Sequence, residues 1–242
     1  IYKGQGRYEA ALPLAQRALA ITEKAYGDVH VSVARSLLNV GSLYQELGRY
    51  EEALPLQVRS LSIYEAERGA DHVDVWVALA ALTSLHEAKG DYDTAMTYAQ
   101  RTLALYENAL HANHPTVATA LSNLALLHRA QGDFETALPL YQRALAIEEA
   151  AFGPQHPNLA PTLNNMAGLY EAQGDYTAAI RLFERTLVIL ERTFGENHPR
   201  VATVINNLGV THSQNGDYTA ALSFHERALT IREALFGENH PS

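Results

Sequence analysis

Six histidines recur in register along this sequence, and imidazole is both a common metal ligand and a proton carrier. They are separated by 42 residues throughout: His30, His72, His114, His156, His198 and His240. Copies in adjacent repeat units would lie roughly 10 Å apart if helices separate them, whereas one zinc ion holds nitrogen ligands at about 2 Å. We therefore expect no metal ion and no other cofactor, and we assign these histidines to turns and helix caps.

A second periodic position accepts either histidine or tyrosine. Its occupants along the chain are Tyr44, His86, His128, Tyr170 and His212. A position that tolerates both rings is typical of side-chain packing with a polar tip, and not of metal binding.

Patterns of catalytic nucleophiles and phosphate-binding loops are missing from the sequence. It contains no G-x-S-x-G, no G-x-x-x-x-G-K-[ST] and no H-E-x-x-H, and His225-Glu226 lacks the second histidine of a metalloprotease. The acidic pairs Glu51-Glu52 and Glu148-Glu149 are expected on solvent-facing sides of helices. We therefore predict that the chain is not an enzyme and assign no catalytic residue.

Asparagine side chains offer a different chemistry, because each amide both donates and accepts a hydrogen bond. One position of the 42-residue period carries Asn39, Asn123, Asn165 and Asn207, and Asn164 and Asn206 stand beside the last two. Asparagine is unusual inside a helix, where it competes for backbone hydrogen bonds. A row of such amides suits the backbone of an extended peptide. The alternative is that they bond to the neighbouring helix and stiffen the stack.

The elements that must position these residues follow from the same period. In the unit at 115–156, apolar residues recur at helical spacing over 117–128, and Gly132 then supplies a left-handed residue that ends the helix. Asp133 is placed to cap a second helix, whose apolar face covers 134–145. An uninterrupted period of this length indicates stacked, equivalent helix pairs.

Small residues and breakers complete the unit. Ala125 and Ala137 are small where the two antiparallel helices would cross, which allows a close approach. Gly153 ends the second helix, and Pro157 begins the next unit at a first helical position, where the missing N–H has no cost.

The core G-[DR]-[YF]-x-x-A of each unit resembles a tetratricopeptide repeat. The longer motifs G-x-x-H-P-x-V-A and L-N-N-L-A are similar to the 42-residue version of kinesin light chains. This resemblance implies an all-α fold, a right-handed superhelical solenoid of antiparallel helix pairs. It also implies that the first helix of each pair lines a concave groove.

We expect residues 1–242 to form a single array. It would contain a partial repeat at 1–30 and full repeats at 31–72, 73–114, 115–156, 157–198 and 199–240. Because the sequence starts and stops within repeats, we expect it to be a fragment of a longer chain.

Composition limits the classes of partner. The 242 residues carry a net charge of −9 and no cysteine. Nucleic acid requires a basic surface, so we expect no nucleic-acid partner. No apolar run of about 18 residues occurs, so we expect no membrane insertion. The lack of cysteine leaves the compartment open, and we expect a cytoplasmic location.

The predicted function is that of a non-catalytic scaffold that binds a peptide or helix of a partner protein in the groove. The predicted contacts are Asn39, Asn123, Asn164, Asn165, Asn206, Asn207, Arg35 and Arg129. Because only Arg35 and Arg129 bring positive charge there, the ligand should be neutral to mildly acidic. The alternatives are a regulatory arm of a larger enzyme or signalling sensor, or end-to-end self-association.

The repeat at 73–114 departs most from the others. Trp76 replaces a small residue, Ala81 replaces the periodic asparagine, and His111 replaces the glycine between repeats. Sequence drift and a specialised pocket or bend both account for these changes.

Overall fold

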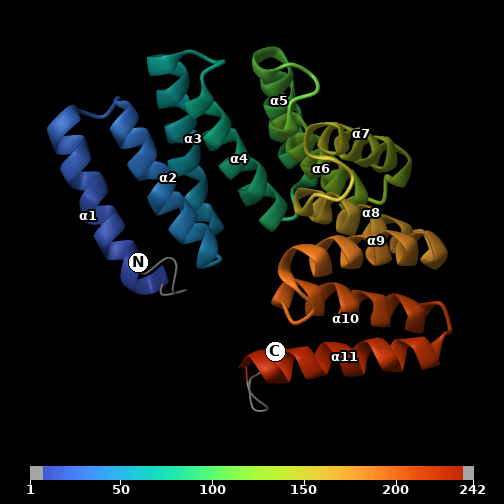
Figure 1. Ribbon diagram of the computed structural model, residues 1–242. Coiled ribbons are helices and arrows are strands. Elements are labelled where there is room, and N and C mark those ends of the chain that lie inside the picture. Colours follow the sequence, from blue (N-terminus) through green and yellow to red (C-terminus); the bar gives the residue numbers. More distant parts are fainter. Residues whose placement is uncertain (1–7, 237–242) are drawn as a thin grey trace. The chain divides into compact units, whose positions relative to one another are not determined.

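Helices make up the regular structure of residues 8–236, the part of the chain that the computed structural model describes. Short connections join them, and no strand occurs among these residues (Figure 1). The helices are α1 (Tyr8–Tyr26), α2 (Val31–Glu46), α3 (Tyr50–Arg68), α4 (Val73–Ala88), α5 (Tyr92–Leu110), α6 (Pro115–Ala130), α7 (Phe134–Phe152), η2 (Pro157–Leu159), α8 (Ala160–Ala172), α9 (Tyr176–Phe194), α10 (Pro199–Gln214) and α11 (Tyr218–Phe236).

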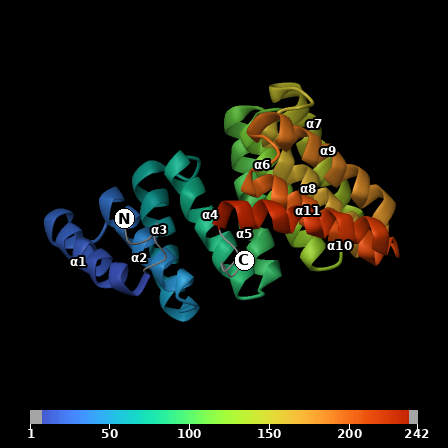
Figure 2. The same ribbon diagram turned by 60° about the horizontal axis from the view of Figure 1, so that its bottom comes forward.

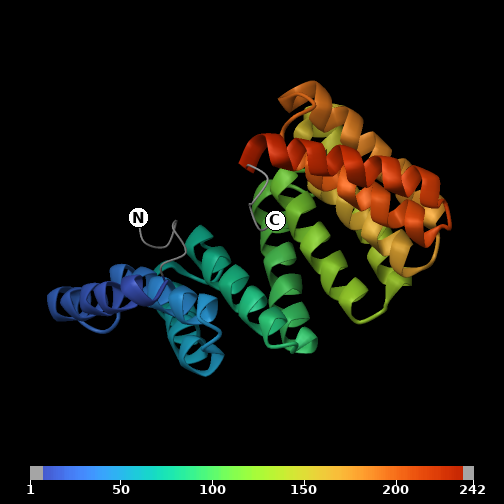
Figure 3. The same cartoon turned by 90° about the horizontal axis from the view of Figure 1, so that it is seen from below.

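The chain divides into two units, which we describe separately. The first unit, Ile1–Ala112, contains α1–α5, and the second unit, Asn113–Ser242, contains α6–α11. Within each unit, every helix packs on the next one in chain order. Figure 2 shows this succession from α1 to α5 in the first unit, and Figure 3 shows it from green α6 to red α11 in the second unit.

The predicted helix pairs are present, so the prediction of an all-α solenoid of helix pairs is confirmed. We call α2, α4, α6, α8 and α10 the first helices, and α1, α3, α5, α7, α9 and α11 the second helices. The second helix predicted within 1–30 is α1, whereas the predicted end of a preceding helix lies in 1–7, outside the described residues. A single continuous array over 1–242 stays a prediction.

The periodic histidines cap the first helices, as predicted. Nδ1 of His30 accepts a hydrogen bond from the backbone N–H of Ser32 at 3.1 Å, and His114 accepts one from Thr116 at 3.2 Å. The same bond, from the backbone N–H two residues later, is present at His72, His156 and His198. His240 lies outside the described residues. Each ring thus satisfies a backbone donor that the first helical turn leaves free.

Aspartates cap the second helices α5, α7, α9 and α11, as predicted for Asp133. Its Oδ1 accepts from the N–H of Thr136 at 3.1 Å, and Oδ2 lies 3.0 Å from Nδ1 of His128. The Thr136 hydrogen bond, together with His128, holds the pKa of Asp133 below its usual range. Gly132 just before it has φ +80°, the left-handed conformation that ends the preceding helix. The histidine–tyrosine position is therefore a packing position whose polar tip, in His128, contacts the cap.

One first helix begins differently from the prediction. Pro157 opens the 3-10 turn η2, and the α-helix starts only at Ala160. Pro161 has no N–H to donate to the Pro157 carbonyl, and the N–H of Ala160 bonds to that carbonyl instead.

His111 occupies a backbone conformation that is almost restricted to glycine. At the ends of the other second helices, Gly69 and Gly153 have φ +88° and +89°, with ψ near 155°. His111, at the end of α5, has φ 69° and ψ 147°. A side chain at such a position costs about 1–3 kcal/mol of strain.

The helix crossings are closely packed. Ala125 and Ala137 are both fully buried where α6 and α7 meet, as their small size predicted. Among the described residues, no helix is both long enough and apolar enough to cross a membrane.

The prediction that Glu148-Glu149 face solvent is wrong for Glu148. Its side chain is 8% exposed, and Oε1 accepts a hydrogen bond from Oγ1 of Thr162 at 3.1 Å. Two repeats earlier the same position holds the buried Tyr64, which shows that this register faces the core. Burial raises the pKa of Glu148, and the Thr162 hydrogen bond opposes that rise.

Candidate functional site

Each first helix exposes a stripe that includes the periodic asparagine position. On α6 the stripe contains Thr119 and Asn123, both exposed, and the half-buried Leu126. These residues follow at i, i+4 and i+7, which is one side of a helix. On α8 and α10 the equivalent Asn165 and Asn207 are half-buried. The periodic packing that buries the other side of each helix therefore leaves this side available.

The first unit carries the same stripe on α2. Arg35 and Asn39 are both exposed there, one helical turn apart. Burial raises the pKa of the Tyr64 hydroxyl. The nearby positive charge of Arg35 opposes that rise, because it favours the phenolate. Arg35 and Asn39 thus lie together, whereas Asn123 and the later asparagines belong to the second unit.

The six asparagine amides predicted as contacts are not used in packing bonds. Within residues 8–236, none of their side chains forms a hydrogen bond with another residue. The residues concerned are Asn39, Asn123, Asn164, Asn165, Asn206 and Asn207. Oδ1 of Asn164 is buried and has no partner in this part of the chain. Since a buried amide oxygen normally finds a partner, the unpaired oxygen of Asn164 is an exception to that rule.

Arg129 reaches from α6 across to α8. A Cβ on Gly168 would collide with its guanidinium group, so the glycine provides the space that the arginine occupies. Arg129 is half-buried, and its guanidinium group has no hydrogen bond or ion pair within the described residues. Burial raises the pKa of nearby Tyr141 to about 12, and the Arg129 charge opposes that rise. An unpaired guanidinium beside Gly168 is suited to an oxygen acceptor, either carbonyl or carboxylate.

Other polar side chains connect consecutive first helices. Nε2 of Gln45 on α2 donates to Oγ of Ser84 on α4 at 2.9 Å. In the second unit, Thr211 donates to Oε1 of Glu171 at 2.6 Å, joining α10 to α8. Sequence reasoning did not identify these bonds, because they pair unlike residues that do not recur with the period. These bonds fix the distance between consecutive first helices, and therefore the distance between their exposed stripes.

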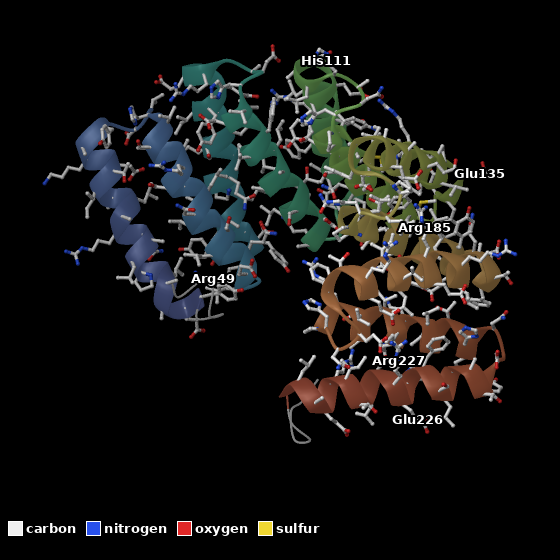
Figure 4. The ribbon with its side chains drawn as sticks, in the orientation of Figure 1. Arg49, His111, Glu135, Arg185, Glu226 and Arg227 are labelled. Carbon is white, nitrogen blue, oxygen red and sulfur yellow. The ribbon has the colours of Figure 1, made fainter. Side chains whose placement is uncertain are left out.

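The periodic arginines form bonds between consecutive second helices. In α9, Nη2 of Arg185 lies 2.5 Å from Oε1 of Glu149 and 2.9 Å from the carbonyl oxygen of Pro154. In α11, Arg227 repeats the carboxylate contact with Glu191 at 2.5 Å, and both arginines are labelled in Figure 4. The arginines recur every 42 residues in the sequence, and glutamates recur at the same interval. This shared period is the signal that could have predicted the ion pairs between second helices.

Trp76 packs in the first unit against α5. Its ring meets Tyr106 edge to face, with 4.7 Å between centroids, and its Nε1 is buried without a partner in the described chain. The side chain is partly buried and packs against the hydrophobic core cluster of the first unit.

Metal-binding clusters are absent from the described residues, where no three His, Cys, Asp or Glu side chains gather closely enough to hold an ion. The periodic histidines instead use Nδ1 for capping.

Known proteins share the helix-pair architecture and the repeat described above. A family model described as "Tetratricopeptide repeat" matches residues 1–66, 32–108, 116–191 and 159–234. No curated protein matches the chain.

Solved structures extend the likeness to the whole chain. BtubC (BKLC) from P. vanneervenii is 25% identical with a TM-score of 0.80, covering 97% of this chain and 94% of that one. Kinesin light chain repeats from Podosopora anserina, described as nearly identical and TPR-like, are 23% identical with a TM-score of 0.72, covering 86% and 98%. MamA is 16% identical with a TM-score of 0.55, covering 86% and 98%. The last two comparisons show the fold alone.

Proposed function

Because the chain belongs to the tetratricopeptide repeat family, whose repeats mediate contacts between proteins, we propose that it is a non-catalytic scaffold that binds a peptide segment. The peptide would lie along the exposed stripes of the first helices. The observation that carries this proposal is that the asparagine amides of these stripes have no hydrogen-bond partner among residues 8–236.

Asparagines on consecutive first helices would hold the backbone of the ligand. An extended peptide presents an N–H and a carbonyl at every residue, and an amide can bond to either. Asn123, Asn165 and Asn207 recur once per helix pair in the second unit, with Asn164 and Asn206 beside the last two. Such contacts would fix the register of the peptide with little dependence on its side chains.

The charge of the stripes favours a neutral to mildly acidic peptide. Arg129 in the second unit and Arg35 in the first unit are the cations at the predicted contact positions. Val77 on α4 and Val210 on α10 are exposed and add apolar surface to the stripes of their own units. We also propose that the partner is a protein and not a nucleic acid, and that the chain binds it in the cytoplasm.

A selection of random peptides on the immobilised protein, followed by affinity measurements, tests the proposal. The variant Asn165→Ala/Asn207→Ala should weaken the selected peptides by about tenfold, since two hydrogen bonds to the backbone are lost. The matched control is Asn108→Ala/Asn197→Ala, which removes two exposed amides outside the first helices. If the Asn165→Ala/Asn207→Ala variant bound the selected peptides as tightly as the wild type does, the proposal that peptides bind along the first helices would be rejected.

Self-association is a second candidate, favoured by the surface of α11. Tyr218, Leu222 and Leu229 on this helix are 72%, 61% and 55% exposed. In α9, the residue equivalent to Leu229 is Leu187, which is buried in the cluster that includes α10 residues. Light scattering over a range of concentrations should show growing mass for the wild type, and a constant monomer mass would exclude this candidate.

A further inference from the structure

A cluster of arginines in the second unit lies outside the first-helix stripes. A cavity of about 500 Å³ opens between α9 and the connection from α7 to η2. We call it the α9 cavity. It is lined by Pro154, Gln155, Arg181, Glu184, Arg185, Val188, Ile189 and Arg192. Its volume is within the range of ligand sites.

Four of the lining residues form one side of α9. Arg181, Arg185, Val188 and Arg192 follow at i, i+4, i+7 and i+11. At 1.5 Å per residue, the first and last arginine are about 16 Å apart along the helix. Val188 lies between them and is 54% exposed. The surface therefore presents two outer cations with an apolar side chain between them.

The three arginines differ in what they already bind. Arg185 is occupied by Glu149 and by the Pro154 carbonyl, so it has a structural role. Arg192 is exposed and donates to Oε1 of Gln155, a neutral acceptor that leaves its charge uncompensated. Arg181 is exposed and has no ion-pair partner among residues 8–236. Glu184, also exposed, supplies one negative charge at the rim.

The cavity's charge is particular to this repeat. One repeat later, on α11, Ser223 and Ala234 stand in place of Arg181 and Arg192. In the preceding loop, Glu196 stands in place of Pro154. The fold therefore accommodates neutral residues at both arginine positions, and the Arg–Glu contact between second helices is kept at Arg227. Packing alone does not require Arg181 or Arg192.

We propose that the α9 cavity binds an extended acidic segment of a partner protein, with one carboxylate on Arg181, another on Arg192 and an apolar side chain on Val188. An extended chain rises about 3.3 Å per residue and alternate side chains share a face, so carboxylates about six residues apart lie on one face at a spacing that the long arginine and glutamate side chains can match. The apolar side chain would share that face, about two residues from the carboxylate on Arg192 and about four residues from the carboxylate on Arg181. A helix is about 10 Å wide, which is too thick to enter a cavity of this size.

This site complements the first-helix stripes, which are poor in positive charge, and its test does not depend on them. The probe is the blocked heptapeptide Glu-Ser-Ser-Ser-Leu-Ser-Glu, in which both Glu and the Leu share one face of an extended chain, with its reverse to cover both chain directions. Binding is measured by fluorescence anisotropy at low salt, because exposed charge pairs are screened by salt. The wild type should bind one of the two peptides, and the same peptide with both Glu replaced by Gln should bind about tenfold more weakly.

The decisive variant is Arg181→Ser/Arg192→Ala, which introduces the residues that the next repeat carries. It should lose about tenfold in affinity, whereas Arg49→Gln/Arg68→Gln, which removes two exposed cations from the first unit, should stay within about twofold. Circular dichroism should show all variants folded. The proposal is overturned if the decisive variant binds as tightly as the wild type or if neither peptide binds by about 1 mM. It is equally overturned if replacing the peptide's Leu with Ser changes nothing, since the cavity would then be a simple anion site.

Discussion

At the scale of single residues, two side chains occupy positions that do not suit them. His111 takes a backbone conformation that the equivalent chain positions reserve for glycine. Glu148 places a carboxyl group in the core, with one oxygen bonded to Thr162 and the other without a partner in the described chain. Both features cost stability, and neither is needed for a helix pair, because other repeats lack them.

Replacing His111 with glycine should stabilise the protein. The substitution His111→Gly removes the strain at φ 69°, and we expect a gain of about 1–2 kcal/mol in the free energy of unfolding. Urea denaturation followed by circular dichroism measures it. The reverse change, Gly153→His at φ 89°, should cost a similar amount. A loss of stability in His111→Gly would show that the imidazole makes contacts that outweigh the strain.

Glu148 should make stability depend on pH. Its pKa is raised by burial, so the folded state favours the protonated carboxyl, and this contribution is present at low pH and is lost as pH rises through the folded pKa. Glu148→Gln removes the ionisation. Its stability relative to the wild type should therefore rise as pH increases above about 4.5, the usual pKa of a glutamate, and then level off once Glu148 is fully ionised in the folded wild type. Denaturation curves from pH 3.5 to pH 8 measure the difference, and a difference independent of pH would contradict the assignment.

At the scale of helices, the caps explain where each element begins. Aspartates cap α5, α7, α9 and α11, each accepting from the N–H three residues on. Arg49 stands at the same position before α3 and forms no side-chain capping bond. It instead pairs with Glu52 at 2.7 Å and lies over the ring of Tyr44.

Restoring the cap at α3 should therefore increase stability. Arg49→Asp would supply the missing acceptor to the first turn, worth about 1 kcal/mol, and would lose an exposed ion pair that contributes less. Arg49→Ala is the control, because it loses the same arginine contacts without adding a cap. Thermal unfolding should rank Arg49→Asp above the wild type and Arg49→Ala below it. The opposite order would mean that the Arg49 contacts dominate.

The helices could be predicted from the sequence because their signals are local and repeated. His114, Gly132 and Asp133 each mark a helix end through their own conformation or through bonds to residues two or three positions away, and the structure confirms all three. The 3-10 start at Pro157 was missed because it depends on Pro161 four residues later. The burial of Glu148 was missed because its charge suggested a solvent-facing position. Its place in the repeat, which it shares with the buried Tyr64, indicated the core instead.

At the scale of the whole molecule, the candidate surfaces differ in how far the sequence could predict them. The stripe residues are in register, and the resemblance to the repeat family led us to expect Asn39 and Asn123 on an accessible side of the first helices, where both are exposed. The α9 cavity could not be predicted in this way, because Arg181 and Arg192 break the period and Arg192 meets Gln155 only through packing of the loop against α9. Non-periodic residues that the fold does not require are therefore where specificity is best sought.

Much of the chain's positive charge is used internally, although the net charge is −9. Arg59, Arg185 and Arg227 each bind a glutamate of the preceding second helix. Arg35 and Arg129 are left at the predicted contacts of the first helices, and neither forms an ion pair among the described residues. This distribution is the reason to expect a largely neutral ligand on the stripes and acidic recognition on α9.

The most direct measurement of the central claim is the response of side-chain amide resonances to a selected peptide. In nitrogen-edited NMR spectra, the NH₂ signals of Asn165 and Asn207 should shift as peptide is added, while those of Asn108 and Asn197 should not. Signals of Asn165 and Asn207 that stay fixed through saturation, with shifts confined to the second helices, would contradict binding along the first helices.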